Sequence, residues 1–164
     1  MTDQNSEPKP KQAKPAGLPG DPIEFQVMNE IGMINQLAGN MFQSCLPKGL
    51  TVAQFSVLNH LLRLDVQQTI SELASAMQVS QPTMSSTVRK LEDKNLVELI
   101  HDPQDRRIRR VAVTDSGEEW RNGAVVALRP MIAGFRNHIA EDTWSLLLPQ
   151  LNQIRVVMDE LRSR

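Results

Sequence analysis

Residues 78–114 read QVSQPTMSSTVRKLEDKNLVELIHDPQDRRIRRVAVT, and this stretch decides the fold. Ser80 is a good helix N-cap, and Pro82 in the first turn removes only an amide that has no partner inside a helix. The apolar residues that follow recur at helical spacing: Met84, Val88 and Leu91. Asn95 can take the left-handed conformation that ends a helix. The stretch therefore predicts a helix that begins after Ser80 and stops close to Asn95.

Two short runs rich in β-branched residues follow, residues 96–100 and 108–113, around the turn sequence Asp102-Pro103-Gln104-Asp105. Such runs on either side of a proline-started turn indicate a β-hairpin. Upstream, Thr51 and Thr69 each precede Gln or Glu by three residues, the spacing of a capping box that starts a helix. Three short helices and a hairpin indicate a mostly α fold that contains a winged helix-turn-helix at residues 48–114.

The segments on either side of this domain are helical and apolar on one face. Residues 23–47 place apolar side chains at spacings of four and three, which predicts an amphipathic helix. Residues 115–164 predict a long helix interrupted at Pro130 and a final leucine-rich helix that contains Pro149. These helices offer more apolar surface than residues 48–114 can cover, which favours dimerisation helices at 23–47 and 115–164 and a homodimer. Packing of the same helices within one chain is the alternative.

The composition excludes several classes of protein. Residues 1–22 hold five of the ten prolines and little to bury, which predicts a flexible tail. No apolar run of about 18 residues and no apolar leader is present, so we expect a cytoplasmic protein without a membrane partner. Cys45 is the only cysteine, and His60, His101 and His138 do not have metal-ligand spacing. The sequence lacks a phosphate-binding glycine loop, a nucleophile elbow and an HExxH helix, so we expect neither an enzyme nor a cofactor.

Charge and hydrogen-bonding groups gather on two elements. The net charge is −1, but residues 80–114 carry seven Lys or Arg against five acids, with four arginines in 105–110. The helix after the turn at residues 78–80 presents the following candidate DNA contacts: Ser80, Gln81, Pro82, Thr83, Ser85, Ser86, Arg89 and Lys90. Gln reads adenine edges, Ser and Thr donate or accept, and Arg and Lys bind phosphate or guanine. An arginine-bearing hairpin suits an adjacent minor groove, so double-stranded DNA is the expected partner. A merely solvated helix face is the alternative.

A family resemblance covers these elements. Residues 50–117 resemble the MarR family of bacterial transcription regulators, and the flanking helices extend the resemblance over about 23–164. Residues 105–114 are similar to the wing signature of the family, D-x-R followed by five residues and then Leu-Thr, with Val113 in place of the leucine. Gly117 also fits the pattern, while Asn95 stands where the family usually has glycine.

The resemblance implies a homodimer whose terminal helices intertwine. Each wing would place Arg107, with Arg106 as a helper, in a minor groove, and Asp105 would orient the arginine by a charge-assisted hydrogen bond. The expected operator is then a near-palindrome, and the regulator is expected to be a repressor.

The resemblance also implies a small phenolic or other amphipathic ligand that releases the DNA by population shift. Candidate ligand contacts are apolar residues on the first two helices: Met33, Met41, Phe42, Phe55 and Leu62. The same side chains at helical spacing are also explained by an ordinary core.

Two other functions stay open at this stage. A winged helix can serve purely as a protein-interaction module, with the arginine hairpin facing an acidic partner. Cys45 suggests a redox-sensing regulator, but it continues an apolar stripe, and buried cysteines are usually inert. In the peroxide-sensing branch of the family the reactive cysteine lies earlier in the first helix and is served by tyrosines, whereas this chain has no tyrosine.

Overall fold

A computed structural model describes residues 15–162 of the chain, in two units that divide after Asn40. The first unit contains residues 15–22 and most of helix α1 (Ile23–Cys45). The predicted flexible tail at residues 1–22 falls largely outside the described residues. Its last part is held by hydrogen bonds, because the amide of Leu18 donates to Asp21 Oδ2 over 2.7 Å and Gln26 Nε2 donates to the carbonyl of Asp21 over 2.9 Å.

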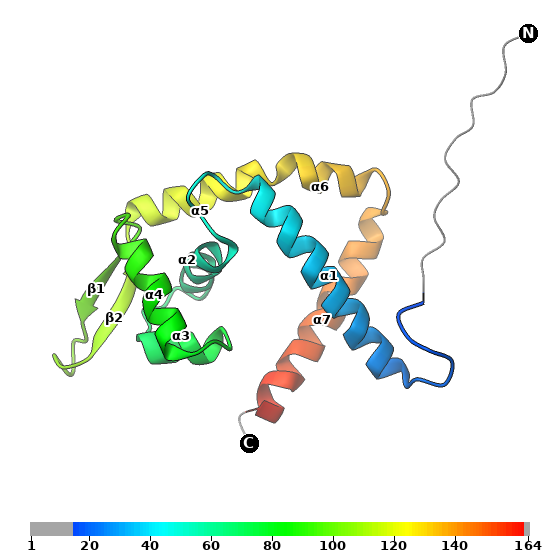
Figure 1. The fold of residues 1–164 in the computed structure, drawn as a ribbon, viewed down its shortest axis with the longest axis horizontal. Coiled ribbons are helices and arrows are strands. Elements are labelled where there is room, and N and C mark those ends of the chain that lie inside the picture. Colours follow the sequence, from blue (N-terminus) through cyan, green and yellow to red (C-terminus); the bar gives the residue numbers. More distant parts are fainter. Residues whose placement is uncertain (1–14, 163–164) are drawn as a thin grey trace, which may run out of the picture. The chain divides into compact units, whose positions relative to one another are not determined.

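The second unit contains the remaining helices and the hairpin, in the order that Figure 1 follows along the chain. The elements are α2 (Val52–Leu64), α3 (Ile70–Ala76), α4 (Gln81–Glu92), β1 (Val97–His101), β2 (Arg109–Val113), α5 (Asp115–Ala127), α6 (Arg129–Arg136) and α7 (Glu141–Arg162). The mostly α winged-helix class is confirmed. The long helix expected to be interrupted at Pro130 is a pair, α5 and α6, because Pro130 lies in the first turn of α6, where a missing amide costs nothing.

The core of the second unit lies between the three short helices and the hairpin. The buried residues that form it are Val57, Leu58, Leu61, Leu73, Ala74, Met84, Val88, Leu91, Leu96, Val97 and Val111. The capping boxes predicted at Thr51 and Thr69 are both present, and each starts a helix that contributes to this core. A smaller cluster joins Leu46, Leu50, Phe55 and Ala124, with Phe42 packed against it. The helix-turn-helix is therefore a packed scaffold that orients the elements on its surface.

Each of the helices α2, α3 and α4 is followed within three residues by a non-glycine residue with a positive φ. These residues are Asp65 (φ 52°), Gln78 (φ 54°) and Asn95 (φ 57°). After each of them the next amide donates to a carbonyl five residues earlier, as in Leu96 N to Leu91 O over 3.0 Å. This is the Schellman arrangement, which satisfies the last carbonyls of a helix and turns the chain sharply. The left-handed conformation predicted for Asn95 is confirmed.

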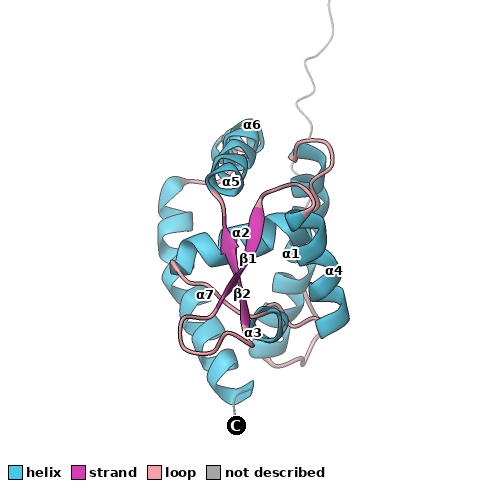
Figure 2. Cartoon of the chain, turned by 90° about the vertical axis from the view of Figure 1, so that its left-hand side faces the viewer, coloured by secondary structure: helices cyan, strands magenta, loops and turns pink. Residues whose placement is uncertain are grey.

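The hairpin is antiparallel, with Val97 opposite Val113 and His101 opposite Arg109. Figure 2 shows the two strands with α2 behind them, and α2 packs against β2. A single bridge from Gln68 to Val111 ties the middle of β2 to the loop between α2 and α3. Beyond this bridge the distal half of the hairpin has no further backbone partner within the described residues.

Among the flanking helices of the described chain, α5 buries Gly117 and Ala124, whereas α1, α6 and α7 contain no buried residue. The apolar side chains of α7 are strongly exposed: Leu146 is 67% exposed, Leu148 66% and Leu161 61%. Exposed apolar surface on this scale marks a site of interaction. No helix among residues 15–162 is long and apolar enough to cross a membrane.

Candidate nucleic-acid interface

The recognition helix α4 begins at a cap that leaves its outer face free. Ser80 has an extended backbone, and its hydroxyl accepts from the amide of Thr83 over 3.3 Å and lies 2.8 Å from the hydroxyl of Thr83. Gln78 turns the chain between α3 and α4 in the left-handed conformation. The N-terminus of α4 therefore points its remaining free amides outward, where a phosphate can bind them.

The two faces of α4 divide as the sequence predicts. Met84, Val88 and Leu91 are buried, and α4 packs on α3 and β1. The predicted DNA contacts on this helix are all exposed: Ser80, Gln81, Pro82, Thr83, Ser85, Ser86, Arg89 and Lys90. The exposed face therefore offers amide, hydroxyl and cationic groups, the chemistry that reads base edges and phosphates.

The loop between the two strands is held by its own backbone and by two carboxylates. Asp102 Oδ1 accepts from the amides of Gln104 (2.8 Å) and Asp105 (3.0 Å), and the amide of Ile108 donates to the carbonyl of Asp105 over 2.9 Å. His101 Nδ1 lies 2.8 Å from the carbonyl oxygen of Arg106. These bonds leave the wing a compact turn with its arginines on the outside.

In the structure Asp105 makes a different contact from the one that the resemblance implies on DNA. Asp105 Oδ1 accepts from the backbone amide of Arg107 over 2.9 Å and has no ion pair with a guanidinium among residues 15–162. An aspartate favours the amide two residues further on because its short side chain mimics a turn of the backbone. Asp105 therefore sets the backbone direction at Arg107. The guanidinium groups of Arg106 and Arg107 have no hydrogen-bond partner within the described chain and stay available to a ligand.

Three residues of the interface were missed from the sequence: Asp102, Arg110 and Glu72. Arg110 Nε donates to Asp102 Oδ2, and Arg110 Nη1 lies 3.4 Å from Glu72 Oε2. The hydrogen bond from Arg110, followed by those from the amides of Gln104 and Asp105, lowers the pKa of Asp102 below its ordinary value. The amide and hydroxyl of Thr69 lower the pKa of Glu72. The arginine run supplied a signal of charge but not of the direction in which each side chain points.

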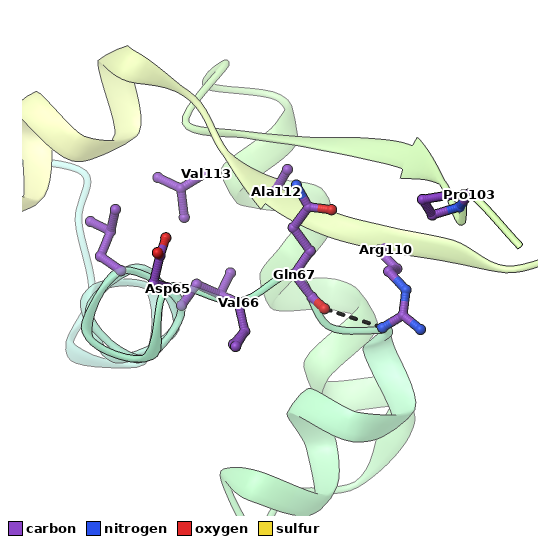
Figure 3. A pocket seen from close by; sticks show the side chains of 9 residues that line it. Asp65, Val66, Gln67, Pro103, Arg110, Ala112 and Val113 are labelled. Carbon is purple, nitrogen blue, oxygen red and sulfur yellow. Dashed lines mark hydrogen bonds between the residues drawn. The ribbon is translucent and has the colours of Figure 1, made fainter.

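A cavity of about 460 Å³ lies beside this ion pair, between the end of α2 and the base of the hairpin. Figure 3 shows Arg110 at one side of it, donating to the carbonyl of Gln67 over 3.2 Å, and Asp65 at the other. Leu62 lines this cavity.

The other predicted ligand contacts lie elsewhere. The rings of Phe42 and Phe55 pack edge to face with centroids 4.9 Å apart, inside the smaller core cluster. Met41 is exposed, and Met33 belongs to the first unit. The structure therefore does not bring the predicted ligand contacts together around one cavity that it describes.

Cys45 is half-buried at the last position of α1, and its Sγ lies 4.0 Å from the hydroxyl of Ser44. Within residues 15–162 no group of three or more His, Cys, Asp or Glu side chains is arranged to hold a metal ion.

An exposed polar helix face, a short helix-turn-helix scaffold and an arginine-bearing hairpin define the class of winged helix-turn-helix nucleic-acid-binding proteins. The sequence matches the model of the MarR family over residues 48–108. The winged helix-turn-helix therefore belongs to the MarR family over the residues that the model matches, and the chain is similar to transcription regulators of that family. Since members of this family regulate transcription, the chain is not an enzyme.

Individual relatives agree with this assignment. The HTH-type transcriptional repressor MdtR of Bacillus subtilis (strain 168) is 25% identical over 122 residues, which cover 71% of this chain and 78% of MdtR. The transcriptional regulator BldR from Sulfolobus solfataricus is 29% identical with a TM-score of 0.71, covering 82% of this chain and 95% of BldR. BpsR of Bordetella bronchiseptica, whose DNA binding is regulated by 6-hydroxynicotinic acid, has a TM-score of 0.64 at 23% identity, covering 79% of this chain and 92% of BpsR.

Proposed function

We propose that the chain is a repressor that binds a near-palindromic operator as a homodimer and releases it when a small amphipathic ligand binds. In this proposal α4 of each protomer enters a major groove through the exposed residues from Ser80 to Lys90. Arg107, assisted by Arg106, enters the adjacent minor groove. A regulator of this kind acts on the chromosome, in the cytoplasm.

One observation carries the DNA-binding part of the proposal. The same packed unit carries the exposed polar face of α4 and a wing whose Arg106 and Arg107 guanidinium groups have no partner within the described residues. Arg121 of α5 is engaged instead, because it donates to Asn59 Oδ1 from both Nε (3.0 Å) and Nη2 (2.7 Å). Unpaired arginine at a hairpin tip suits the concentrated negative potential of a narrow minor groove.

The exposed helices support the dimer. Within the described residues neither α1 nor α7 contains a fully buried residue, yet each presents exposed apolar residues along its length. A second copy of the same chain is the partner that covers such faces symmetrically. Two-fold symmetry then places the two recognition helices about 34 Å apart, one turn of DNA, and predicts an inverted repeat in the operator.

The ligand part of the proposal rests on the relatives. BpsR responds to 6-hydroxynicotinic acid, a small aromatic acid, and a ligand of similar chemistry is proposed here. Met41, Phe42, Phe55 and Leu62 remain our candidate contacts. A ligand that prefers dimers with a different spacing of the recognition helices lowers DNA affinity by population shift.

The test starts with selection of duplexes from a random pool by the purified full-length protein. We expect an inverted repeat to be enriched, and its affinity to fall linearly with salt on a double-logarithmic plot. Arg107→Ala should weaken binding to the enriched duplex by about 5–150-fold, the equivalent of about 1–3 kcal/mol. Arg129→Ala removes an exposed arginine of α6 and serves as the matched control, with a change of less than about twofold expected.

The outcomes separate the competing functions. A folded dimer that enriches no DNA site contradicts the proposal and favours a protein-interaction module. An Arg107→Ala variant with the affinity of the parent contradicts the wing assignment alone. Addition of 6-hydroxynicotinic acid and related hydroxybenzoates to the preformed complex tests release. If none releases DNA at millimolar concentration, the small-aromatic-acid part of the proposal is wrong.

A further inference from the structure

Arg110 differs from the other arginines of the wing because its side chain points into the protein. It lies on β2 opposite Ile100, and its side chain is 28% exposed. Its Nε donates to Asp102, and its Nη1 reaches both the carbonyl oxygen of Gln67 (3.2 Å) and Glu72 Oε2 (3.4 Å). One guanidinium therefore joins the wing to the loop that precedes α3 and to α3 itself.

The wing end of this link is the residue that shapes the turn. Asp102 is only 7% exposed, and its Oδ1 accepts the amides of Gln104 and Asp105 while its Oδ2 accepts from Arg110. Each carboxylate oxygen thus has a separate task. When Arg110 holds Oδ2, the turn that carries the DNA-facing arginines is held to β2 by the same carboxylate.

The other end of the link is already rigid. Glu72 is the third residue of α3, and its Oε2 accepts the amide of Thr69 over 2.7 Å in the capping box of that helix. Helix α3 in turn packs on α4. A chain of direct contacts therefore runs from the wing turn through Arg110 to the scaffold that carries the recognition helix.

The hairpin needs such a link. Two strands alone are marginally stable, and the ladder to a third segment consists of the single Gln68–Val111 bridge at the middle of β2. The distal half of the wing is therefore held by side chains. A wing that is free to swing loses conformational entropy when it docks on DNA, and that loss weakens binding.

We propose that Arg110 is a positioning residue that holds the wing at a fixed angle to α3 and α4, so that the wing and the recognition helix engage one duplex together. This inference rests on the proposed function and adds a residue that does not itself contact DNA. The planar guanidinium is required, because it donates in several directions at once from Nε and Nη1, whereas the ammonium of lysine places all its donors on one atom.

The decisive substitution is Arg110→Lys, which keeps the positive charge and removes the planar guanidinium with its separate Nε and Nη1 donors. Arg109→Lys is the matched control, because Arg109 is the exposed neighbour and forms no ion pair or side-chain hydrogen bond within residues 15–162. We expect Arg110→Lys to weaken binding to the selected duplex by about tenfold, and Arg109→Lys by less than about twofold. Circular dichroism tests whether both variants are folded. If Arg110→Lys does not fold, Asp102→Asn takes its place, because it removes the same ion pair from the side of the carboxylate.

A double-mutant cycle distinguishes positioning from a direct phosphate contact. In an Arg107→Ala background the wing no longer binds its groove, so Arg110→Lys should change affinity by less than about twofold. Losses that multiply instead identify an independent DNA contact at Arg110 and overturn the inference.

Hydrogen exchange of the free protein provides a readout that does not depend on DNA. Amides of residues 104–108 should exchange faster in Arg110→Lys than in the parent, while those of α4 stay unchanged. Equal exchange rates in the wing overturn the inference. If Arg107→Ala leaves affinity unchanged but the wing amides of Arg110→Lys exchange faster, the link stands and only the proposed wing–DNA contact fails.

Discussion

Gly117 lies where the first turn of α5 crosses the carbonyl of Leu96, and replacing it with alanine should destabilise the protein. A Cβ built at this position collides with the carbonyl oxygen of Leu96 and lies 2.8 Å from Val113 Cγ1. The clash is with backbone, which cannot move aside as a flexible side chain does. The surrounding bonds are Thr114 N to Leu96 O (3.2 Å) and Gly117 N to the Thr114 hydroxyl (3.1 Å), so relief of the clash strains the cap of α5.

The magnitude follows from these contacts. Overpacking of a tight site costs about 1–3 kcal/mol, and loss of the cap at Thr114 adds about 0.5–2 kcal/mol. The better helix propensity of alanine offsets at most about 1 kcal/mol. We therefore expect a net loss of about 0.5–5 kcal/mol in the free energy of unfolding, or roughly 1–20 °C in the melting temperature of a chain of this size.

Gly123 provides an internal control in the same helix. A Cβ at Gly123 meets nothing within 4 Å, so Gly123→Ala should stabilise the protein by about 0.5–1 kcal/mol through helix propensity alone. Both variants are compared with the parent by urea unfolding, followed by circular dichroism at one protein concentration because a dimer's stability depends on concentration. Stabilisation of the protein by Gly117→Ala, equal to that by Gly123→Ala, would refute the close approach of α5 to Leu96.

Three further predictions concern single residues. Asn95→Ala should cost about 1–2 kcal/mol, because φ is 57° there and alanine disfavours the left-handed region, whereas Asn95→Gly should cost nothing measurable by the same unfolding assay. The hydrogen bond from Arg110 holds the pKa of Asp102 below its ordinary value, so the contribution of this carboxylate to stability is complete above about pH 4 and is lost as the pH falls through the lowered pKa. Unfolding between pH 6 and pH 2.5 should therefore show a smaller loss for Asp102→Asn than for the parent. Cys45→Ser should leave operator affinity and its response to peroxide unchanged in a gel-shift assay, and loss of a peroxide response on this substitution would support redox sensing instead.

Much of the scaffold could be predicted because its signals are local. The side-chain caps at Thr51, Thr69 and Ser80 are present as predicted, since a cap needs only the residue and the amide three positions on. The buried stripe of α4 follows in the same way from helical periodicity. The ends of α2 and α3 gave no such signal, because Asp65 and Gln78 adopt a conformation usually taken by glycine.

The position of the wing could be predicted from the sequence, but the pairing of its charged side chains could not. Arg110 and Glu72 are 38 positions apart, and no periodicity relates them. The pattern assigned the orienting carboxylate to Asp105, which stands two residues before Arg107. In the structure the Asp105 carboxylate accepts a hydrogen bond from the backbone amide of Arg107 instead. The carboxylate that binds a guanidinium is that of Asp102, which pairs with Arg110 on the opposite strand. A carboxylate beside several arginines has several geometrically reasonable partners, and only the register of the hairpin selects among them.

That selection changes how the charge of the wing should be counted. The run at 105–110 contains four arginines, but Arg110 is paired with Asp102 and approaches Glu72, and both carboxylates have lowered pKa values and stay ionised at neutral pH. A guanidinium already neutralised in this way releases no counterion from DNA when the complex forms. The proposed wing contacts Arg106 and Arg107 can then add at most two cations per wing to the salt dependence of binding, with about 0.9 in the slope for each phosphate neutralised. The inward arginine contributes to affinity through geometry, and the outward ones through charge.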